Sequence, residues 1–342
     1  MVHNKFTKYI LSAVFMIIIA VFLIQVSSII SKENITSAEN IYTDTGFYFD
    51  TFVTFTIYDD TMTKENAEEI FLNAFNLCEY YEHIFSRNLS DSELSKLNNT
   101  ISQNSHTFNP DFNYSISEEL KDLINIGLEY STLTDNSFDI TLGKLTRLWD
   151  FKAKKIPSDK EISEALLYDE IDLGGIAKGY IADKLKEYFS SQNVYSGIIN
   201  LGGNILLIGS KPDGKPFNIG IKKPFDEGNN IAIACLSDLS IVTSGIYERY
   251  FISDDILFHH IIDPSTGYPV NNHIYSVTII SNSSTTADAL STSCLVLGMD
   301  KALTLINSLD NTYCIIIKDD YDIITSDGIN MDINGNITIE AN

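Results

Sequence analysis

Basic residues are scarce in this chain of 342 residues, which has 23 lysines and arginines against 46 aspartates and glutamates. The formal net charge of −23 argues against a nucleic-acid-binding protein, because such a protein needs a basic surface. The same acidity disfavours acidic partners. Any anionic ligand must therefore be held by local groups, such as a metal ion, a helix terminus or one or two lysines.

Cysteine is also rare, and its positions exclude two kinds of site. None of the four cysteines is spaced as a metal-binding pair, and each lies in an apolar run, which favours buried thiols over disulfides. No cysteine precedes Cys78, so a lipid-modified cysteine near the N-terminus is excluded. The cysteines are Cys78, Cys235, Cys294 and Cys314.

Charged residues are absent from residues 9–30, and Lys5 and Lys8 precede this apolar run. At ~1.5 Å per residue, a helix of this length spans the hydrocarbon core of a bilayer. The preceding lysines and the acidic chain that follows favour a cytoplasmic N-terminus with the remainder outside the cell membrane. A cleaved signal peptide is the alternative. We predict a membrane anchor or signal segment over 1–31, a polar linker over 32–45 and one domain over 46–342.

Hydrophobic periodicity divides the predicted domain into helices and strands. Apolar residues recur at helical spacing near residues 67–78, 120–128 and 177–185, and a further helix is predicted over 284–297. Two-fold alternation predicts strands at 46–58, 197–209, 217–222, 230–236, 239–243, 248–253, 257–262, 275–280 and 313–318. Strands clustered between helical segments favour an α+β fold, with mixed or antiparallel sheets and packed helices, over a regular doubly wound sheet.

Residues 172–185 read Asp-Leu-Gly-Gly-Ile-Ala-Lys-Gly-Tyr-Ile-Ala-Asp-Lys-Leu, an acid and two glycines followed by an amphipathic helix. Glycine lets a phosphate or another backbone approach closely, and a helix start offers free N–H groups to an anion. A tight strand-to-helix turn is the alternative. The segment is not a P-loop, because no serine or threonine follows Lys178-Gly179, and its glycine spacing differs from the dinucleotide fingerprint.

Two further segments carry candidate reactive side chains. Asp288 and Thr292 are four residues apart in a predicted helix, so they share one face, where an acid and a hydroxyl can bind a hard cation. Taken alone, that pair is more often a solvated helix face. His260 ends a predicted strand before a Pro–Gly turn, and taken alone it is more often a structural histidine than a catalyst.

Seven blocks of sequence together resemble the ApbE family, the FAD:protein FMN transferases, from about residue 49 to residue 298. Among them are Thr-Ser-Gly-Ile-Tyr-Glu-Arg-Tyr at 243–250 and His-Ile-Ile-Asp-Pro-Ser-Thr-Gly at 260–267. The other blocks lie at 85–98, 137–151, 172–180, 200–204 and 287–292.

The resemblance implies an ApbE-like fold and a magnesium-dependent transfer of FMN from FAD to a threonine or serine hydroxyl of an acceptor protein, with release of AMP. It places Mg²⁺ on the backbone oxygen of Gly175, the carboxylate of Asp288 and the hydroxyl of Thr292. It makes His260 the catalytic base, assisted by the metal-bound Asp288. The flavin contacts it implies are Phe49, Asn88, Ser137, Phe138, Asp139, Asp172, Lys178, Ile261 and Ile262.

The resemblance also bears on partners and on departures from the family pattern. Family acceptors include flavin subunits of membrane electron-transport complexes, which suits a domain held outside the membrane. Phe49 stands where the family often has methionine, and either side chain can cover a flavin. Asn88 stands where the family often has tyrosine, which removes a possible stacking surface over the flavin.

Two other functions remain open. In the first, water replaces the acceptor hydroxyl, and the protein is a magnesium-dependent FAD pyrophosphatase that forms FMN and AMP. In the second, it is an FAD-binding protein outside the cytoplasm with no reaction to catalyse. A pure binding protein would not need Gly175, Asp288, Thr292 and His260 together, which favours an enzyme.

Overall fold

The computed structural model describes residues 40–104, 107–226 and 228–339. The predicted anchor or signal segment over 1–31 lies outside these residues, as does most of the predicted linker over 32–45. No helix in the described part of the chain combines the length and the apolar character that a membrane span requires.

A β-hairpin opens the described chain and corrects two predictions. Strands β1 (Ile41–Tyr48) and β2 (Thr51–Tyr58) pair antiparallel, so residues 41–45 belong to a strand and not to a linker. The single strand predicted over 46–58 is wrong, because the chain reverses at Phe49 and Asp50. Both residues have positive φ, 55° and 59°, as a two-residue hairpin turn of the primed type requires. Phe-Asp lacks the glycine or asparagine that usually announces such a turn.

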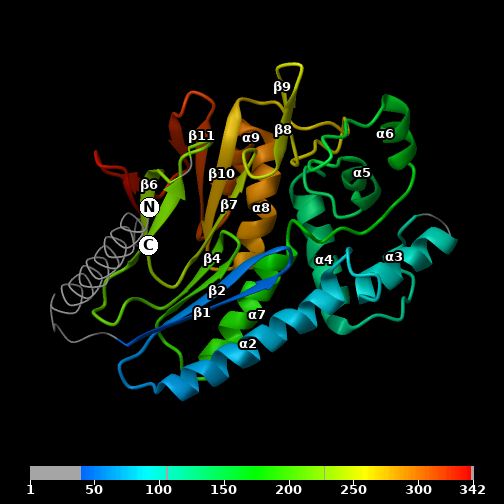
Figure 1. Cartoon of the computed structure of the whole chain (residues 1–342). Helices are drawn as coiled ribbons and strands as arrows, with labels where there is room; N and C mark the ends of the chain where they lie inside the picture. The colour runs from blue at the N-terminus through cyan, green and yellow to red at the C-terminus, as the bar shows by residue number, and fades with distance from the viewer. Residues whose placement is uncertain (1–39, 105–106, 227, 340–342) are drawn as a thin grey trace, which may run out of the picture. The chain divides into compact units, whose positions relative to one another are not determined.

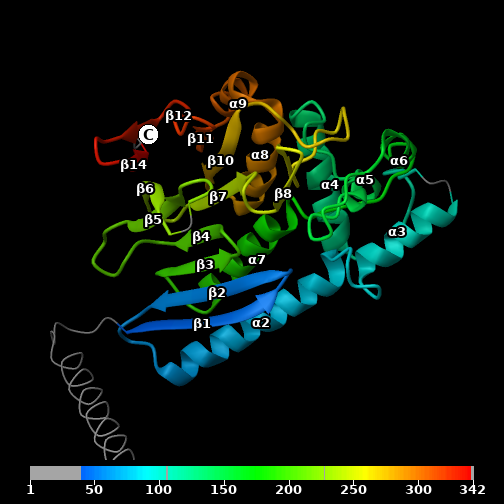
Figure 2. The same cartoon turned by 45° about the horizontal axis from the view of Figure 1, so that its top comes forward.

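An antiparallel sheet forms the centre of the fold (Figure 2). Across the sheet the order is β1, β2, β3 (Gly197–Leu201), β4 (Asn204–Ile208), β7 (Ser240–Gly245), β10 (Ile274–Ser281), β11 (Thr312–Lys318) and β12 (Ile323–Thr325). Strands β1 and β2 form one hairpin and β3 and β4 form another, and helices α2 (Lys64–Phe85) to α7 (Ala177–Ser191) lie in the connection between the two hairpins.

A smaller sheet covers part of one face of the main sheet. Strand β5 (Phe217–Lys222) alternates buried and exposed residues, as a strand with one covered face should. Its buried residues pack with Leu207, Ile280 and Ile315 of the main sheet. The order of the smaller sheet is β13 (Ile329–Met331), β14 (Asn336–Ile339), β6 (Asn230–Leu236) and β5, and only the β14–β6 pair is parallel.

Helices cover the other face of the main sheet and form the larger core (Figure 1). Helix α7 (Ala177–Ser191) packs on β3 and β4, and α8 (Ser284–Leu297) packs on β7 and β10. Both lie where the sequence predicts helices. The other helices are α2 (Lys64–Phe85), α3 (Glu93–Asn104), α4 (Glu118–Leu133), α5 (Gly143–Leu148), α6 (Asp159–Ala165) and α9 (Met299–Ile306).

A separate small core holds the segment that follows His260. The single tryptophan, Trp149, is buried there with residues of α5 and α6, and its indole N–H donates to the carbonyl of Gly267 over 3.0 Å. The hairpin of β8 (Tyr250–Ser253) and β9 (Ile256–His259) packs beside it through Phe258. Sheets with packed helices confirm the predicted α+β class.

Candidate active site

The start of α7 is built from two chain segments that run side by side. The Asp172 N–H donates to the carbonyl of Ile140 over 2.7 Å, and the Glu170 N–H donates to Thr141 over 3.0 Å. A Cβ atom on Gly175 would lie 2.9 Å from the ring of Phe138, so a larger residue would push this buried ring aside. The predicted flavin segment at 137–139 therefore adjoins the predicted metal residue Gly175.

Helices α7 and α8 meet at Asp288. The Gly179 N–H donates to Asp288 Oδ2 over 2.9 Å, and Lys178 Nζ lies 3.7 Å from Asp288 Oδ1. Asp288 is 4% exposed, so the interpretation of a solvated helix face is wrong for it. A buried carboxylate needs compensation, which here comes from one backbone N–H and one ammonium group. The structure thus brings together Lys178 and Asp288, residues 110 positions apart in the sequence.

The Thr292 hydroxyl lies one helical turn after Asp288 and bonds to a side chain of the main sheet. Ser244, near the end of β7, has its Oγ 3.0 Å from Thr292 Oγ1 and 2.8 Å from Ser291 Oγ. Ser244 belongs to a block that resembles the family, but residue types alone gave no reason to single it out. Its contact with α8, a helix that begins 40 residues later in the chain, can be recognised only in the folded structure.

These side chains offer oxygen donors of the kind that Mg²⁺ prefers. In the described residues, no group of three or more His, Cys, Asp or Glu side chains could hold a metal ion by itself. One carboxylate, one hydroxyl and one backbone carbonyl suit Mg²⁺, which usually takes one or two carboxylates and completes its shell with water and substrate phosphates. Asp288, Thr292 and Gly175 therefore fit the predicted ion, provided that the substrate supplies further oxygens.

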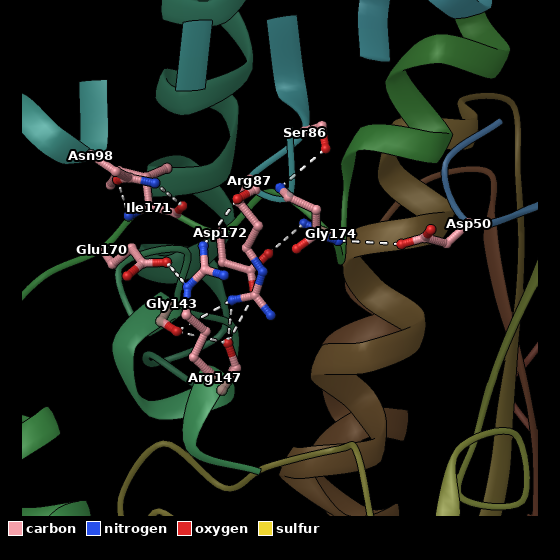
Figure 3. A network of polar contacts seen from close by, with 12 residues as sticks. Asp50, Ser86, Arg87, Asn98, Gly143, Arg147, Glu170, Ile171, Asp172 and Gly174 are labelled. Carbon is pink, nitrogen blue, oxygen red and sulfur yellow. Dashed lines mark hydrogen bonds and ion pairs between the residues drawn. The ribbon is translucent and has the colours of Figure 1, made fainter. Parts of the chain in front are cut away.

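A polar network surrounds Asp172 at the turn before α7 (Figure 3). Arg87 Nη1 lies 2.7 Å from Asp172 Oδ2, and the hydroxyl of Thr146 donates to the same oxygen over 3.0 Å. The other oxygen, Oδ1, accepts the Gly174 N–H over 3.0 Å. Arg87 also donates to Thr146 Oγ1 over 2.6 Å. Asp172 thus fixes the glycine turn by accepting one of its N–H groups. Its partner Arg87 is a neighbour of the site that the sequence pattern did not identify.

Asn88 and Phe49 lie at the edge of this network. The Asn88 amide donates to Asp50 Oδ2 over 3.2 Å, which ties the 86–88 loop to the hairpin turn. The Phe49 N–H donates to Glu82 Oε1 over 2.8 Å. Asn88 is exposed and Phe49 is half-buried. Asn88 therefore directly follows Arg87, which pairs with Asp172, and Phe49 lies in the hairpin turn to which Asn88 bonds.

Ser137 and Asp139 line a pocket of about 400 Å³. Asp263 and Ser265, which follow Ile261 and Ile262, line the same pocket with Lys301. The two predicted flavin segments, at 137–139 and 261–262, thus adjoin one cavity. The side chains of Phe138 and Ile261 are buried in the protein cores at 6% and 4% exposure, so their predicted contacts with a flavin would use main-chain atoms.

His260 directly follows β9, and its ring is held uncharged. Its Nδ1 is buried and has no hydrogen-bond partner among the residues that the structure describes. Burial, followed by the positive charge of Arg249 and the neighbouring His259, lowers the pKa of His260 to about 3. The charge of Lys178 acts in the same direction, which places His260 within electrostatic reach of the Lys178–Asp288 pair. This pKa lies well below the value of about 6.5 of an unperturbed histidine, so the ring is neutral near pH 7.

His259 is a structural histidine. It is 2% exposed, its Nε2 donates to the carbonyl of Val270 over 2.8 Å, and its Nδ1 accepts the Ile261 N–H over 3.3 Å. Both ring nitrogens are used in the neutral form, so a second proton would face an N–H donor. Burial lowers the pKa of His259 to about 4. This side chain fixes the strand end from which His260 and Ile261 extend.

Stability should fall as the pH drops from 6.5 toward 4, because the unfolded chain then binds a proton at His259 that the folded chain does not. Between about pH 7 and pH 4.5, the loss of unfolding free energy should be smaller in His259→Gln than in the wild type by about 2 kcal/mol. Urea unfolding of both proteins at both pH values measures this difference. Equal pH dependence of the two proteins would contradict it.

Comparison with known proteins gives this arrangement a context. Residues 49–316 match the model of the ApbE family. The chain is 31% identical over 283 residues to the FAD:protein FMN transferase of Klebsiella pneumoniae, covering 76% of this chain and 85% of the relative. It is 30% identical over 292 residues to the protein of the same name from Treponema pallidum, covering 75% and 78%.

Solved structures agree with these relatives. The crystal structure of the ApbE protein from Thermotoga maritima matches with a TM-score of 0.74 and 30% identity, covering 84% of this chain and 97% of that one. The flavin transferase ApbE from Vibrio cholerae matches with a TM-score of 0.71 and 26% identity, covering the same shares of the two chains. The start of α7, Asp288, Thr292 and His260 all lie within the region that matches the family model.

Proposed function

The chain belongs to the ApbE family, and from this we propose that it is an FAD:protein FMN transferase. The acceptor hydroxyl oxygen forms a bond to the phosphorus of the FMN half of FAD, the bridging P–O bond of the pyrophosphate breaks, and AMP leaves. The observation that carries the proposal is the meeting of α7 and α8, where a buried carboxylate lies beside a lysine and a helix start. The lysine, the helix start and a metal ion bound by the carboxylate could together hold a pyrophosphate.

Magnesium dependence is part of this proposal. Gly175, Asp288 and Thr292 would hold Mg²⁺, which supplies neutralising charge at the pyrophosphate oxygens. Lys178 adds a second positive charge from the first turn of α7. The Gly179 N–H holds the Asp288 carboxylate in place, so the charges are ordered before substrate arrives.

His260 is the proposed proton acceptor for the attacking hydroxyl. The ring is neutral at physiological pH, so a lone pair is free to accept a proton. Burial is the largest cause of the low pKa of His260, and the charges of Arg249 and Lys178 lower this pKa further. The negative charges of a bound pyrophosphate would oppose the effect of these two cations and so raise the pKa toward that of a working base.

We place the reaction outside the cell membrane, with the uncharged run at 9–30 as the anchor or signal segment. The acceptor is a protein with a threonine or serine to be flavinylated, and a subunit of a membrane electron-transport complex suits this location. The anchor and the partner both rest on the sequence and on the family resemblance.

The test uses the full-length chain in detergent with FAD, MgCl₂ and a purified candidate acceptor. The acceptor should gain the mass of one FMN, with an equal amount of AMP released. The same mixture with EDTA should give neither product. If no family acceptor gains mass under any metal condition, the proposed activity is wrong.

A second activity, hydrolysis of FAD, is favoured by Asn88. A tyrosine at this exposed position could stack on the flavin and keep water out, whereas asparagine is bonded to Asp50 instead. Stacking of a base on an aromatic ring is worth roughly 1–3 kcal/mol. Without it, water competes with the acceptor hydroxyl for the same phosphorus.

We expect magnesium-dependent AMP release from FAD in the absence of acceptor, and less of it in Asn88→Tyr, by about fivefold or more. Asn88→Ala is the matched control, because it also removes the bond to Asp50 but adds no ring. Chromatography of AMP measures all three proteins. Equal AMP release from Asn88→Tyr and Asn88→Ala would show that stacking at this position does not limit water.

A further inference from the structure

Asp183 of α7 is bonded to the first turn of α8, a helix that begins 101 residues later in the chain. Its carboxylate accepts the N–H groups of Ser284 and Thr285 over 2.8 and 2.9 Å. It also accepts the hydroxyls of Ser283 and Thr285 over 2.9 and 2.7 Å. A helix start leaves N–H groups without partners and attracts negative charge. The first turn of α8 has no acid of its own, so α7 supplies one.

A second contact lies one turn away on both helices. Gly179 precedes Asp183 by four residues on α7, and Asp288 follows Ser284 by four residues on α8, so each pair shares a helix face. A Cβ atom on Gly179 would lie 2.3 Å from the Ser284 carbonyl oxygen, so only glycine permits this approach. The Gly179 N–H then reaches Asp288 Oδ2. Asp183 and Gly179 therefore contact α8 at successive turns.

We propose that Asp183 is a positioning residue for the metal and pyrophosphate site, an inference that rests on the proposed function. By holding the start of α8 against α7, it fixes the position of α8 along the axis of α7. This relative position of the two helices decides whether Asp288 and Thr292 lie beside Gly175 and Lys178. Asp183 itself touches neither substrate nor metal, because its carboxylate is occupied by the start of α8.

The test measures Mn²⁺ affinity, by the electron paramagnetic resonance signal of free Mn²⁺, in full-length wild type, Asp183→Asn and Asp183→Ala. Three of the four bonds go to Oδ2, so an amide nitrogen at that place would lose three acceptors. We expect affinity to fall by about tenfold in Asp183→Asn and further in Asp183→Ala. Should Asp183→Ala not fold, Asp183→Asn alone decides.

Ser117→Ala is the matched control. It removes the side-chain cap of α4, where Ser117 accepts the Leu120 N–H over 3.2 Å and donates to Glu93 over 2.7 Å. It should lower the Tm and leave Mn²⁺ affinity unchanged. A purely structural role for Asp183 predicts instead that Mn²⁺ affinity falls together with the Tm in Asp183→Asn and in Ser117→Ala alike, or that it changes in neither variant. Either result would overturn the inference.

The wild type separates this inference from the proposed function. If it transfers FMN but Asp183→Asn binds Mn²⁺ as tightly as the wild type, only the positioning role fails. If it neither transfers FMN nor hydrolyses FAD, while Mn²⁺ affinity still depends on Asp183, the proposed function fails and the positioning role stands. A wild type that binds no Mn²⁺ overturns the inference.

Discussion

Replacing Asp288 by asparagine is expected to lower FMN transfer by about a hundredfold or more, because the site loses its buried negative charge and its proposed metal ligand. Asparagine keeps an oxygen that can accept the Gly179 N–H, now 2.9 Å from Asp288 Oδ2. Alanine is the poorer choice, because it would leave that N–H buried without a partner, at a cost of about 1–3 kcal/mol of stability. The assay is mass gain of the acceptor at saturating FAD.

Asp300→Asn provides the control for Asp288→Asn. Asp300 is an exposed acid in the first turn of α9 and is not one of the predicted site residues, so its replacement removes the same charge without removing a predicted ligand. Its transfer rate should match the wild type, and the melting temperatures of the two variants should lie close together. Wild-type activity of Asp288→Asn in the presence of EDTA would remove both Asp288 and the metal from the mechanism.

Replacing His260 by asparagine is expected to preserve FAD binding and to slow transfer by about 10²–10⁴-fold, the usual contribution of a general base. At low FAD concentrations, where the rate reports the protonation state of the enzyme before substrate binds, transfer should show no loss from protonation of His260 between about pH 5 and pH 7, because burial lowers its pKa to about 3. FAD fluorescence measures binding, and single-turnover formation of flavinylated acceptor measures the rate.

His83→Asn serves as the control for His260, since His83 lies exposed on α2 and its ring bonds to the Glu79 carbonyl of the same helix, 2.9 Å away. It should transfer FMN at the wild-type rate. Should His260→Asn also transfer at that rate, the proton goes elsewhere. Asp288 or a metal-bound hydroxide is then the alternative acceptor, and a double variant at His260 and Asp288 would test the first.

The elements with clear periodicity were predicted from the sequence, and the local reversal near Phe49 was not. Helix α4 covers Glu118–Leu133, around the range 120–128 that its apolar stripe predicts, because such a stripe leaves few alternatives. The turn at Phe49 and Asp50 was missed because Phe-Asp is not one of the pairs, such as Asn-Gly or Asp-Gly, that indicate a primed turn. Its positive φ angles are fixed by the pairing of the flanking strands β1 and β2.

Residue chemistry identified candidate groups, and the fold supplied their partners. Asp288 was found as an acid on a helix face, but its burial follows from Gly179, which lets α7 approach to contact distance. Arg87 and Asp183 resemble ordinary charged residues of a loop and a helix. Their partners, Asp172 and the start of α8, are 85 and about 100 residues away, and no periodic pattern encodes such pairings.

The contact between Gly179 and Asp288 also sets the order in which the protein becomes competent during its synthesis. The two residues are 109 positions apart, and strands β3 to β10 are made between them. A nascent chain that ends before α8 has the lysine and the glycine turn of α7 but neither Asp288 nor Thr292. Such a chain cannot assemble the proposed magnesium site, so FAD cleavage must wait until α8 has left the ribosome and packed on α7.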